Sequence, residues 1–278
     1  MMNLTEIIDN ALCEDLGDGD HSSLASLSPQ LVRKAKITAK EDGILAGVEV
    51  AKQVAERVDK SLKVDIRIAD GTPIRKGDVV MTIEGSAISL LSAERTMLNF
   101  MQRMSGIATQ TNAIVKLLEG THTRLLDTRK TTPGFRLVEK MAVKIGGGYN
   151  HRFGLFDMIM LKDNHIDYAG GIRQAVEATH RYLKEKKLNL KIEVETRSLD
   201  DVCEVMQVGG VDRIMLDNFA PEMIVEALKI IDGKYETEAS GGITLANIRA
   251  YAETGVDFIS VGALTHHIKS IDLSMTAM

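Results

Sequence analysis

Several features are scarce in this sequence of 278 residues, and each scarcity argues against a class of protein. Basic residues are not in excess: 34 Lys and Arg stand against 39 Asp and Glu, and a net charge of −5 argues against a nucleic-acid-binding surface. No apolar run reaches the ~18 residues that a membrane span needs. Low-complexity segments and long runs of one charge sign are also lacking, which argues against disorder.

Cysteine is equally scarce. The two cysteines, Cys13 and Cys203, lie far apart, each among apolar residues at helical spacing, so we expect buried free thiols and no disulfide. The first twenty residues are acidic and amphipathic, unlike a secretory signal. These features predict a protein of the reducing cytoplasm.

A repeating pattern begins near residue 122. Short runs with strand character end in a polar residue or glycine, and a helical pattern follows each run. The runs are residues 123–127, 156–162, 190–195, 212–217, 237–240 and 257–262. Successive runs that end at Asp217, Ser240 and Gly262 are about 22 residues apart, which suits one strand, one helix and two loops. Right-handed βαβ units of this kind predict a parallel α/β barrel.

The N-terminal part has another pattern. Alternating polar and apolar residues turn at Asp42-Gly43, and a helical segment covers residues 48–60. A long helix is predicted over residues 89–119, with a break near Ser105-Gly106. We therefore expect an α+β domain over residues 1–108, joined by the tail 267–278, and a barrel domain over residues 109–266.

Positive charge gathers between residues 127 and 166, which hold seven Lys and Arg, two His and four acids. Arg136, Lys140 and Lys144 recur at helical period beside an apolar face, which favours a solvated basic stripe. Thr132-Pro133 predicts the start of this helix, with threonine as the N-cap and proline in the first turn.

Five other cations belong to no helical stripe: Arg129, Lys130, His151, Arg152 and Lys162. Arg129 and Lys130 follow one predicted strand, and Lys162 ends the next. Residues after the strands of a parallel barrel converge on one edge, where active sites lie. We therefore expect these five cations to be neighbours.

Two acids, Glu195 and Asp217, also end predicted strands, and Glu193 shares the face of Glu195. One interpretation is an internal network of salt bridges. The other is a site for a multiply anionic substrate, in which the two acids bind Mg²⁺.

Small residues follow the last two strands. Ser240-Gly241-Gly242 precedes a helical pattern, and Gly262 follows the final strand. Such residues let backbone N–H groups approach an anion, and these loops form a phosphate site in many barrels.

At this point the sequence resembles the quinolinate phosphoribosyltransferases, also called carboxylating nicotinate-nucleotide pyrophosphorylases. The resemblance covers nearly the whole chain. Its most specific blocks are DTRKTTPGFR and GGGYNHRFGLFDMIMLKDNHI, supported by EDLGDGD, ERTMLNFMQRMSGIAT, IEVE, IMLDN, EASGGI and FISVGALTH.

The resemblance implies a type II phosphoribosyltransferase fold, an open TIM-like α/β barrel beside an N-terminal α+β domain. It implies transfer of phosphoribosyl from phosphoribosyl pyrophosphate to quinolinate, with loss of CO₂, to give nicotinate mononucleotide and pyrophosphate in NAD biosynthesis. It also implies a homodimer or homohexamer and Mg²⁺ as cofactor.

The resemblance assigns roles to residues. Quinolinate is bound by Arg129, His151, Arg152 and Lys162, with Arg95 donated by a neighbouring subunit. Lys130, Glu195 and Asp217 act on phosphoribosyl pyrophosphate and Mg²⁺ as the catalytic residues. The 5′-phosphate is held by Ser240, Gly241, Gly242 and Gly262.

Two alternatives stay open. A phosphoribosyltransferase for another base, such as nicotinate, needs fewer cations because only one carboxylate must be held. A non-catalytic paralogue would bind phosphate ligands without turnover.

Overall fold

A computed structural model describes residues 2–278, and the chain divides into two compact units. The first unit comprises Met1–Ala113, Lys130–Gly147 and Ala263–Met278, and the second comprises Ile114–Arg129 and Gly148–Gly262. The division expected from the sequence, at residue 108 with the tail 267–278 joining the N-terminal part, stays a prediction. No helix within residues 2–278 is long and apolar enough to cross a membrane.

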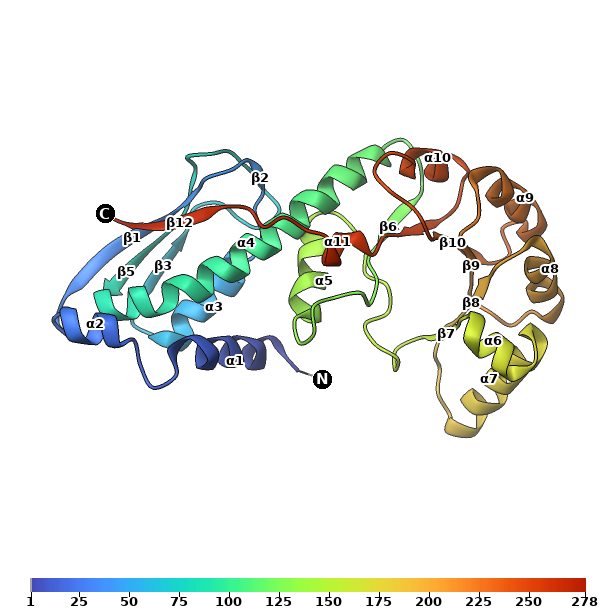
Figure 1. The fold of residues 1–278 in the computed structure, drawn as a ribbon, viewed down its shortest axis with the longest axis horizontal. Helices are drawn as coiled ribbons and strands as arrows, with labels where there is room; N and C mark the ends of the chain where they lie inside the picture. The colour runs from blue at the N-terminus through green and yellow to red at the C-terminus, as the bar shows by residue number, and fades with distance from the viewer. Residues whose placement is uncertain (1) are drawn as a thin grey trace. The chain divides into compact units, whose positions relative to one another are not determined.

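The first unit contains an antiparallel sheet in the order β12-β1-β5-β3 and a two-stranded sheet, β2-β4 (Figure 1). Their bounds are β1 Val32–Ala39, β2 Gly43–Ile44, β3 Lys63–Ile66, β4 Pro73–Ile74, β5 Val79–Ser86 and β12 Leu273–Ala277. In β1, alternate residues Ala35, Ile37 and Ala39 are buried, as the period of two requires for a sheet with one covered face.

Helices α3 and α4 lie over one face of this sheet (Figure 1). The helices of the first unit are α1 Leu4–Leu16, α2 His21–Ser26, α3 Val48–Val58, α4 Ala87–Leu117, which continues past Ala113, α5 Arg136–Ile145 and α11 Ala263–His266. Helix α4 is continuous, so the predicted break near Ser105-Gly106 is wrong. A Cβ on Gly106 would lie 2.3 Å from the backbone O of Lys269, so the glycine permits a close backbone approach and does not end the helix.

Helix α5 differs from its prediction in two respects. It begins at Arg136 with Phe135 as N-cap, because Thr132, Pro133 and Gly134 form a turn closed by a hydrogen bond from Phe135 N to Thr132 O. Lys140 is only 3% exposed, so the predicted solvated stripe is wrong at this position. The neighbouring residues Val138 and Glu139 are also fully buried, which shows that the helix is covered over a wide arc.

Both cysteines are free thiols, as predicted, but neither is buried. Cys13 is exposed because it lies on the solvent side of α1, away from the buried Ile8 and Leu12. Cys203 is half-buried in α8 Leu199–Val208.

The second unit contains a six-stranded parallel sheet in the order β6-β11-β10-β9-β8-β7 (Figure 1). The strands are β6 Arg124–Leu126, β7 Ile159–Leu161, β8 Ile192–Thr196, β9 Arg213–Asp217, β10 Glu236–Ser240 and β11 Phe258–Ser260. Within residues 2–278, β6 and β7 do not pair with each other, so the sheet winds in chain order but stays open. This confirms the predicted open α/β barrel.

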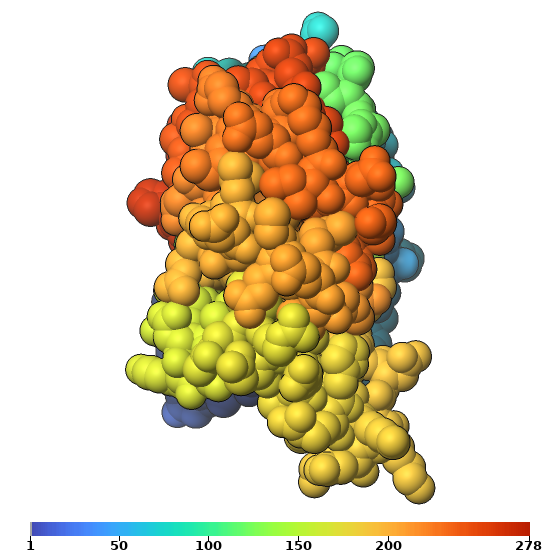
Figure 2. All heavy atoms as spheres, turned by 90° about the vertical axis from the view of Figure 1, so that its right-hand side faces the viewer, coloured from blue at the N-terminus to red at the C-terminus, as the bar shows by residue number. Residues whose placement is uncertain are grey.

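Helices α6 to α10 follow one another over the outside of this sheet, and Figure 2 shows that outer face. Their bounds are α6 Asp163–Ala169, α7 Ile172–Lys186, α8 Leu199–Val208, α9 Pro221–Ile231 and α10 Ile248–Glu253. All five residues of β8 are buried, which is typical of a parallel strand covered on both faces.

Candidate active site

The predicted site residues of the second unit lie at the carboxyl ends of its parallel strands. Ser240 pairs with Asp217 across β10 and β9, and Leu161 pairs with Val194 across β7 and β8. Lys162 directly follows Leu161, and Glu195 directly follows Val194, so Lys162 and Glu195 also lie at one level of the sheet. Gly262 follows two residues after the end of β11.

Glu195 is buried between charges of both signs. Burial raises the pKa of its carboxyl, and the nearby Asp217 raises it further. Lys162 acts in the opposite sense and lowers the pKa, as does a hydrogen bond from the backbone N–H of Asp163. Two carboxylates and a lysine therefore interact at this edge, as the sequence predicted.

Arg152 is 9% exposed and interacts with Arg129. Its Nη1 donates to the backbone O of Met158 at 3.1 Å, and its Nη2 contacts the sulfur of Met160 at 3.5 Å. Burial and then repulsion from Arg129 lower the pKa of Arg152. Two guanidinium groups that repel each other favour an anionic ligand between them, because such a ligand offsets their repulsion.

Two carboxylates anchor the loop that carries Arg152. Asp127, fully buried after β6, accepts from His151 N at 2.8 Å and from Asn150 Nδ2 at 2.5 Å. Asp157 accepts from Phe153 N at 2.6 Å and from Gly154 N at 2.8 Å. Sequence reasoning did not identify these two acids, although both occur in the basic segment.

His151 belongs to a buried charged cluster inside the sheet. Its side chain is 5% exposed, and Nε2 lies 3.0 Å from Glu193 Oε2 and 3.4 Å from Glu238 Oε2. Arg213 Nη1 donates to Glu238 Oε2 at 2.9 Å. Burial lowers the pKa of His151, but the two carboxylates outweigh it and raise the pKa to about 9. His151 therefore lies in an internal network of salt bridges, the first of the two interpretations that the sequence left open.

The same cluster could hold a metal ion, because the ligand atoms of His151, Glu193 and Glu238 lie within 4.8 Å of one another. However, Arg213 already neutralises Glu238, and Mg²⁺ prefers oxygen ligands to imidazole nitrogen. Glu195 and Asp217 offer carboxylate oxygens at the open end of the strands. Their chemistry fits Mg²⁺ better than that of the buried cluster.

The loop Ser240-Gly241-Gly242 has the backbone that its glycines predict. Both glycines adopt positive φ angles, +90° and +61°. A Cβ on Gly241 would lie 2.2 Å from Asn218 Oδ1, whereas a Cβ on Gly242 would enter open space. The predicted helix does not follow at once, since α10 starts only at Ile248.

Asn218 contacts two of the predicted site residues, although sequence reasoning did not single it out. It is itself in the left-handed region, with φ +59°, and its Nδ2 donates to Asp217 Oδ2 at 2.7 Å. Its backbone N–H donates to Ser240 O at 2.8 Å, which joins the ends of β9 and β10. The sequence did offer one sign of its place, because Asn218 directly follows Asp217, the acid that ends β9.

Two predicted residues belong to the first unit. Arg95 is exposed on α4, and Lys130 is exposed at the start of the segment that leads to α5. His266 in α11 is close enough to Lys130 for their charges to interact. Burial, His267 and Lys130 all lower the pKa of His266.

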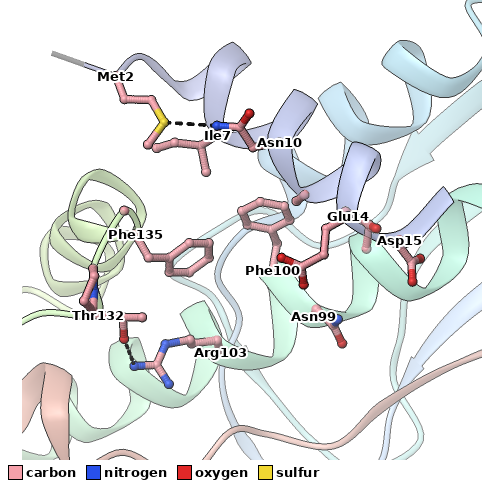
Figure 3. Close-up of a pocket in the computed structure, with 14 residues that line it drawn as sticks. Met2, Ile7, Asn10, Glu14, Asp15, Asn99, Phe100, Arg103, Thr132 and Phe135 are labelled. Carbon is pink, nitrogen blue, oxygen red and sulfur yellow. Dashed lines mark hydrogen bonds between the residues drawn. The ribbon is translucent and has the colours of Figure 1, made fainter. Parts of the chain in front are cut away.

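A cavity of about 570 Å³ also lies in the first unit, between α1, α4 and the turn before α5 (Figure 3). Phe100 and Phe135 stack in it with ring centroids 5.2 Å apart. Arg103 and Thr132 line its base, whereas none of the predicted site residues lines it.

Family comparisons agree with this geometry. The model of the quinolinate phosphoribosyl transferase C-terminal domain matches residues 107–276, and that of the N-terminal domain matches residues 20–105. The chain belongs to this family.

Individual relatives of the quinolinate phosphoribosyltransferase family match over nearly full length. A decarboxylating quinolinate phosphoribosyltransferase of Nicotiana glauca is 45% identical over 98% of this chain and 82% of its own. A probable carboxylating nicotinate-nucleotide pyrophosphorylase of Bacillus subtilis is 42% identical over 99% and 93%. The crystal structure of NadC from Streptococcus pyogenes superposes with a TM-score of 0.93 at 40% identity, covering 100% of this chain and 99% of that one. The resemblance inferred from the sequence is therefore confirmed.

Proposed function

We infer that this protein is a carboxylating nicotinate-nucleotide pyrophosphorylase, a pentosyltransferase of NAD biosynthesis. It transfers phosphoribosyl from phosphoribosyl pyrophosphate to quinolinate and forms nicotinate mononucleotide, CO₂ and pyrophosphate. The family match over the whole chain carries this inference. The cations and acids at the ends of the strands supply the chemistry that the two substrates require.

Quinolinate is proposed to bind to the cations. Its two adjacent carboxylates need two or more cationic partners, and guanidinium groups bind carboxylates in bidentate fashion. The mutual repulsion of Arg129 and Arg152 supports this assignment, because a dianion relieves it. The proposed direct ligands are Arg129, Arg152 and Lys162, with Arg95 from a second subunit, and His151 is proposed to add positive charge from its buried cluster.

Phosphoribosyl pyrophosphate is proposed to bind beside them, with Mg²⁺. Glu195 and Asp217 would hold the metal ion, which when bound neutralises charge on the pyrophosphate. Lys130 supplies a further cation for the pyrophosphate. Ser240, Gly241, Gly242 and Gly262 would hold the 5′-phosphate with backbone N–H groups, which the open space at the Cβ position of Gly242 supports.

The reaction needs positioning and charge more than a nucleophilic side chain. The pyridine nitrogen of quinolinate attacks the anomeric carbon of the ribose while the bond to pyrophosphate breaks. Glu195 and Asp217 stabilise positive charge that develops on the sugar. The resulting pyridinium accepts the electron pair of the adjacent carbon–carboxylate bond, CO₂ leaves, and a proton from solvent takes its place on the ring.

Incubation with quinolinate, phosphoribosyl pyrophosphate and Mg²⁺ tests this function by following the loss of quinolinate and the release of CO₂. Faster turnover of nicotinate than of quinolinate would instead support the enzyme for another base. Binding of phosphoribosyl pyrophosphate in calorimetry without product would support the non-catalytic paralogue. Lys130→Ala and Arg152→Ala should each abolish turnover while thermal unfolding stays cooperative, and near-normal turnover in either would exclude the assigned role.

The assembly and location complete the proposal. A homodimer or homohexamer in which Arg95 completes a neighbouring site explains why this arginine is exposed on α4. A cytoplasmic location stays a prediction, since curated relatives include chloroplastic and mitochondrial proteins.

A further inference from the structure

The backbone around Lys130 is held from outside its own segment. Residues 130–132 form neither helix nor strand, so no regular ladder of hydrogen bonds fixes them. A lysine side chain has four rotatable bonds, and its reach depends on where its Cα is held. The contacts that fix this backbone therefore decide where the ammonium group can go.

The first contact comes from Thr265 in α11. Its Oγ1 donates to the backbone O of Lys130 at 2.7 Å. Thr265 is fully buried, whereas Lys130 is exposed. A buried hydroxyl thus holds the main chain of a residue whose side chain faces solvent.

The second contact is a charged pair behind Thr265. Arg103 of α4 donates from Nε and Nη2 to Glu139 Oε1 at 2.9 and 2.6 Å, and the Glu139 carboxylate is fully buried. Nη2 also reaches the backbone O of Thr265 at 3.1 Å and Thr132 Oγ1 at 3.0 Å; the latter contact is visible in Figure 3. Glu139 Oε2 in turn accepts from the backbone N–H of Thr132 at 3.1 Å.

These contacts form a single network. One guanidinium joins α4, α5, α11 and the segment 130–132, and the segment is held at both ends, at Lys130 O and at Thr132 N. The Glu139 carboxylate is fully buried and Arg103 is partly buried, so removal of the guanidinium would leave a buried carboxylate without its charged partner, and the pair holds the network together.

We propose that Thr265, supported by Arg103 and Glu139, is a positioning residue for phosphoribosyl pyrophosphate, acting through the backbone of Lys130. The inference rests on the proposed role of Lys130 at the pyrophosphate. Loss of the Thr265 hydroxyl leaves Lys130 O without this donor and lets the segment shift. A displacement of about 1 Å at a charged contact is enough to impair transition-state stabilisation strongly.

The test compares Thr265→Val, which removes the hydroxyl at nearly constant volume, with Thr265→Ser, which retains it. Thr123→Val is the matched control: Thr123 is also buried and donates to backbone carbonyls, those of Val256 at 2.7 Å and Ala252 at 3.3 Å, at the opposite end of β6. We expect Thr265→Val to raise KM for phosphoribosyl pyrophosphate roughly tenfold and to leave KM for quinolinate within about twofold. Thr265→Ser should restore the wild-type value.

A purely structural role predicts a different result. Both valine variants would then lower Tm by similar amounts, and neither would change KM for phosphoribosyl pyrophosphate selectively. Equal KM changes for both substrates, or the same KM change in Thr123→Val, would overturn the proposal.

A double-mutant cycle tests whether the effect passes through Lys130. The dissociation constant of phosphoribosyl pyrophosphate with Mg²⁺ is measured by calorimetry for the wild type, Lys130→Ala, Thr265→Val and the double variant. We expect Thr265→Val to have no further effect once Lys130 is alanine. Additive effects would overturn the proposal while the role of Lys130 stands. Unchanged affinity in Lys130→Ala would overturn that role as well.

Discussion

Asp127 Oδ1 accepts a hydrogen bond from the backbone N–H of His151 at 2.8 Å, and Oδ2 accepts from Asn150 Nδ2 at 2.5 Å. A buried acid at the end of β6 thereby fixes the chain just before Arg152. The backbone of Tyr149 adds to the same anchor, since it pairs with Leu126 as an isolated parallel bridge. The cation-bearing loop is therefore held beside the first strand of the barrel before any ligand binds.

Asp127→Asn should weaken quinolinate binding. An asparagine side chain has one accepting oxygen, and its NH₂ group would face either the His151 N–H or the Asn150 NH₂, which are both donors. One of the two buried hydrogen bonds is therefore lost, at a cost of about 1–3 kcal/mol. We expect KM for quinolinate to rise roughly tenfold or more, with a lower Tm. Asp201→Asn is the control, since Asp201 accepts the backbone N–H of Arg197 at an exposed turn. A normal KM in Asp127→Asn would show that the loop keeps its position without this anchor.

The stability of the protein should fall between pH 6.5 and pH 9 because of His151. The pKa of His151 is raised to about 9, so its stabilising contribution is complete below pH 6.5 and is lost as pH rises through 9. The rise of the pKa from 6.5 to about 9 corresponds to about 3 kcal/mol of stability. This value is an upper limit, because the backbone N–H of Arg152 donates to Nδ1 and opposes a second proton on the ring. Burial and Glu238 also raise the pKa of Glu193, which gives the same sign.

Urea unfolding of the wild type and His151→Gln at pH 6 and pH 9 measures this effect. The wild type should lose more stability than the variant across this range. His180→Gln, at an exposed histidine of α7, should behave as the wild type. Equal losses in the wild type and His151→Gln would mean that the ring does not bind the extra proton.

The sequence was informative where topology alone places a residue. A parallel strand brings its last residue to the same edge as its neighbours, so Glu195, Asp217 and Ser240 could be located from the period of the pattern. The parallel α/β barrel followed from the same spacing, whereas its open form was implied by the resemblance to the family. The exposure of Cys13 and the burial of Lys140 could not be obtained in this way, because they depend on which faces of α1 and α5 are covered by distant segments.

Pairings between distant residues were also beyond the sequence. Arg103 and Glu139 are far apart in the chain, and no periodicity connects a residue of α4 with one of α5. The cluster of His151 and Glu193 gave a weaker signal: Glu193, Arg213 and Glu238 are charged residues within the strands β8, β9 and β10. Charged residues in a covered parallel strand need partners, but the sequence does not say which ones.

Gly241→Ala should disturb the proposed phosphate loop in two ways, through strain at its positive φ angle and through a clash of the added Cβ with Asn218. The added Cβ would lie 2.2 Å from Asn218 Oδ1 and would displace Asn218, which bonds to Asp217. Gly170→Ala is the control, since Gly170 has nearly the same φ, +89°, and open space at the Cβ position. Both variants should lose about 1–2 kcal/mol from left-handed strain. Only Gly241→Ala should raise KM for phosphoribosyl pyrophosphate, and equal kinetics in the two would separate this loop from the site.

The carboxylates Glu195 and Asp217 should control the response to Mg²⁺. Glu195→Gln and Asp217→Asn keep the size of each side chain but remove a charge, and a hard divalent cation needs carboxylate ligands. We expect each variant to bind phosphoribosyl pyrophosphate with Mg²⁺ at least tenfold more weakly in calorimetry, and to need more Mg²⁺ for half-maximal turnover. Tm should stay the same or rise, because desolvation and the repulsion of Asp217 raise the pKa of Glu195 and make its charge unfavourable.

Glu226→Gln, on the exposed side of α9, is the control and should change neither the affinity for phosphoribosyl pyrophosphate with Mg²⁺ nor the Mg²⁺ needed for half-maximal turnover. Wild-type affinity for Mg²⁺ and phosphoribosyl pyrophosphate in both carboxylate variants would exclude this pair as the metal site and leave His151, Glu193 and Glu238 as the cluster to examine.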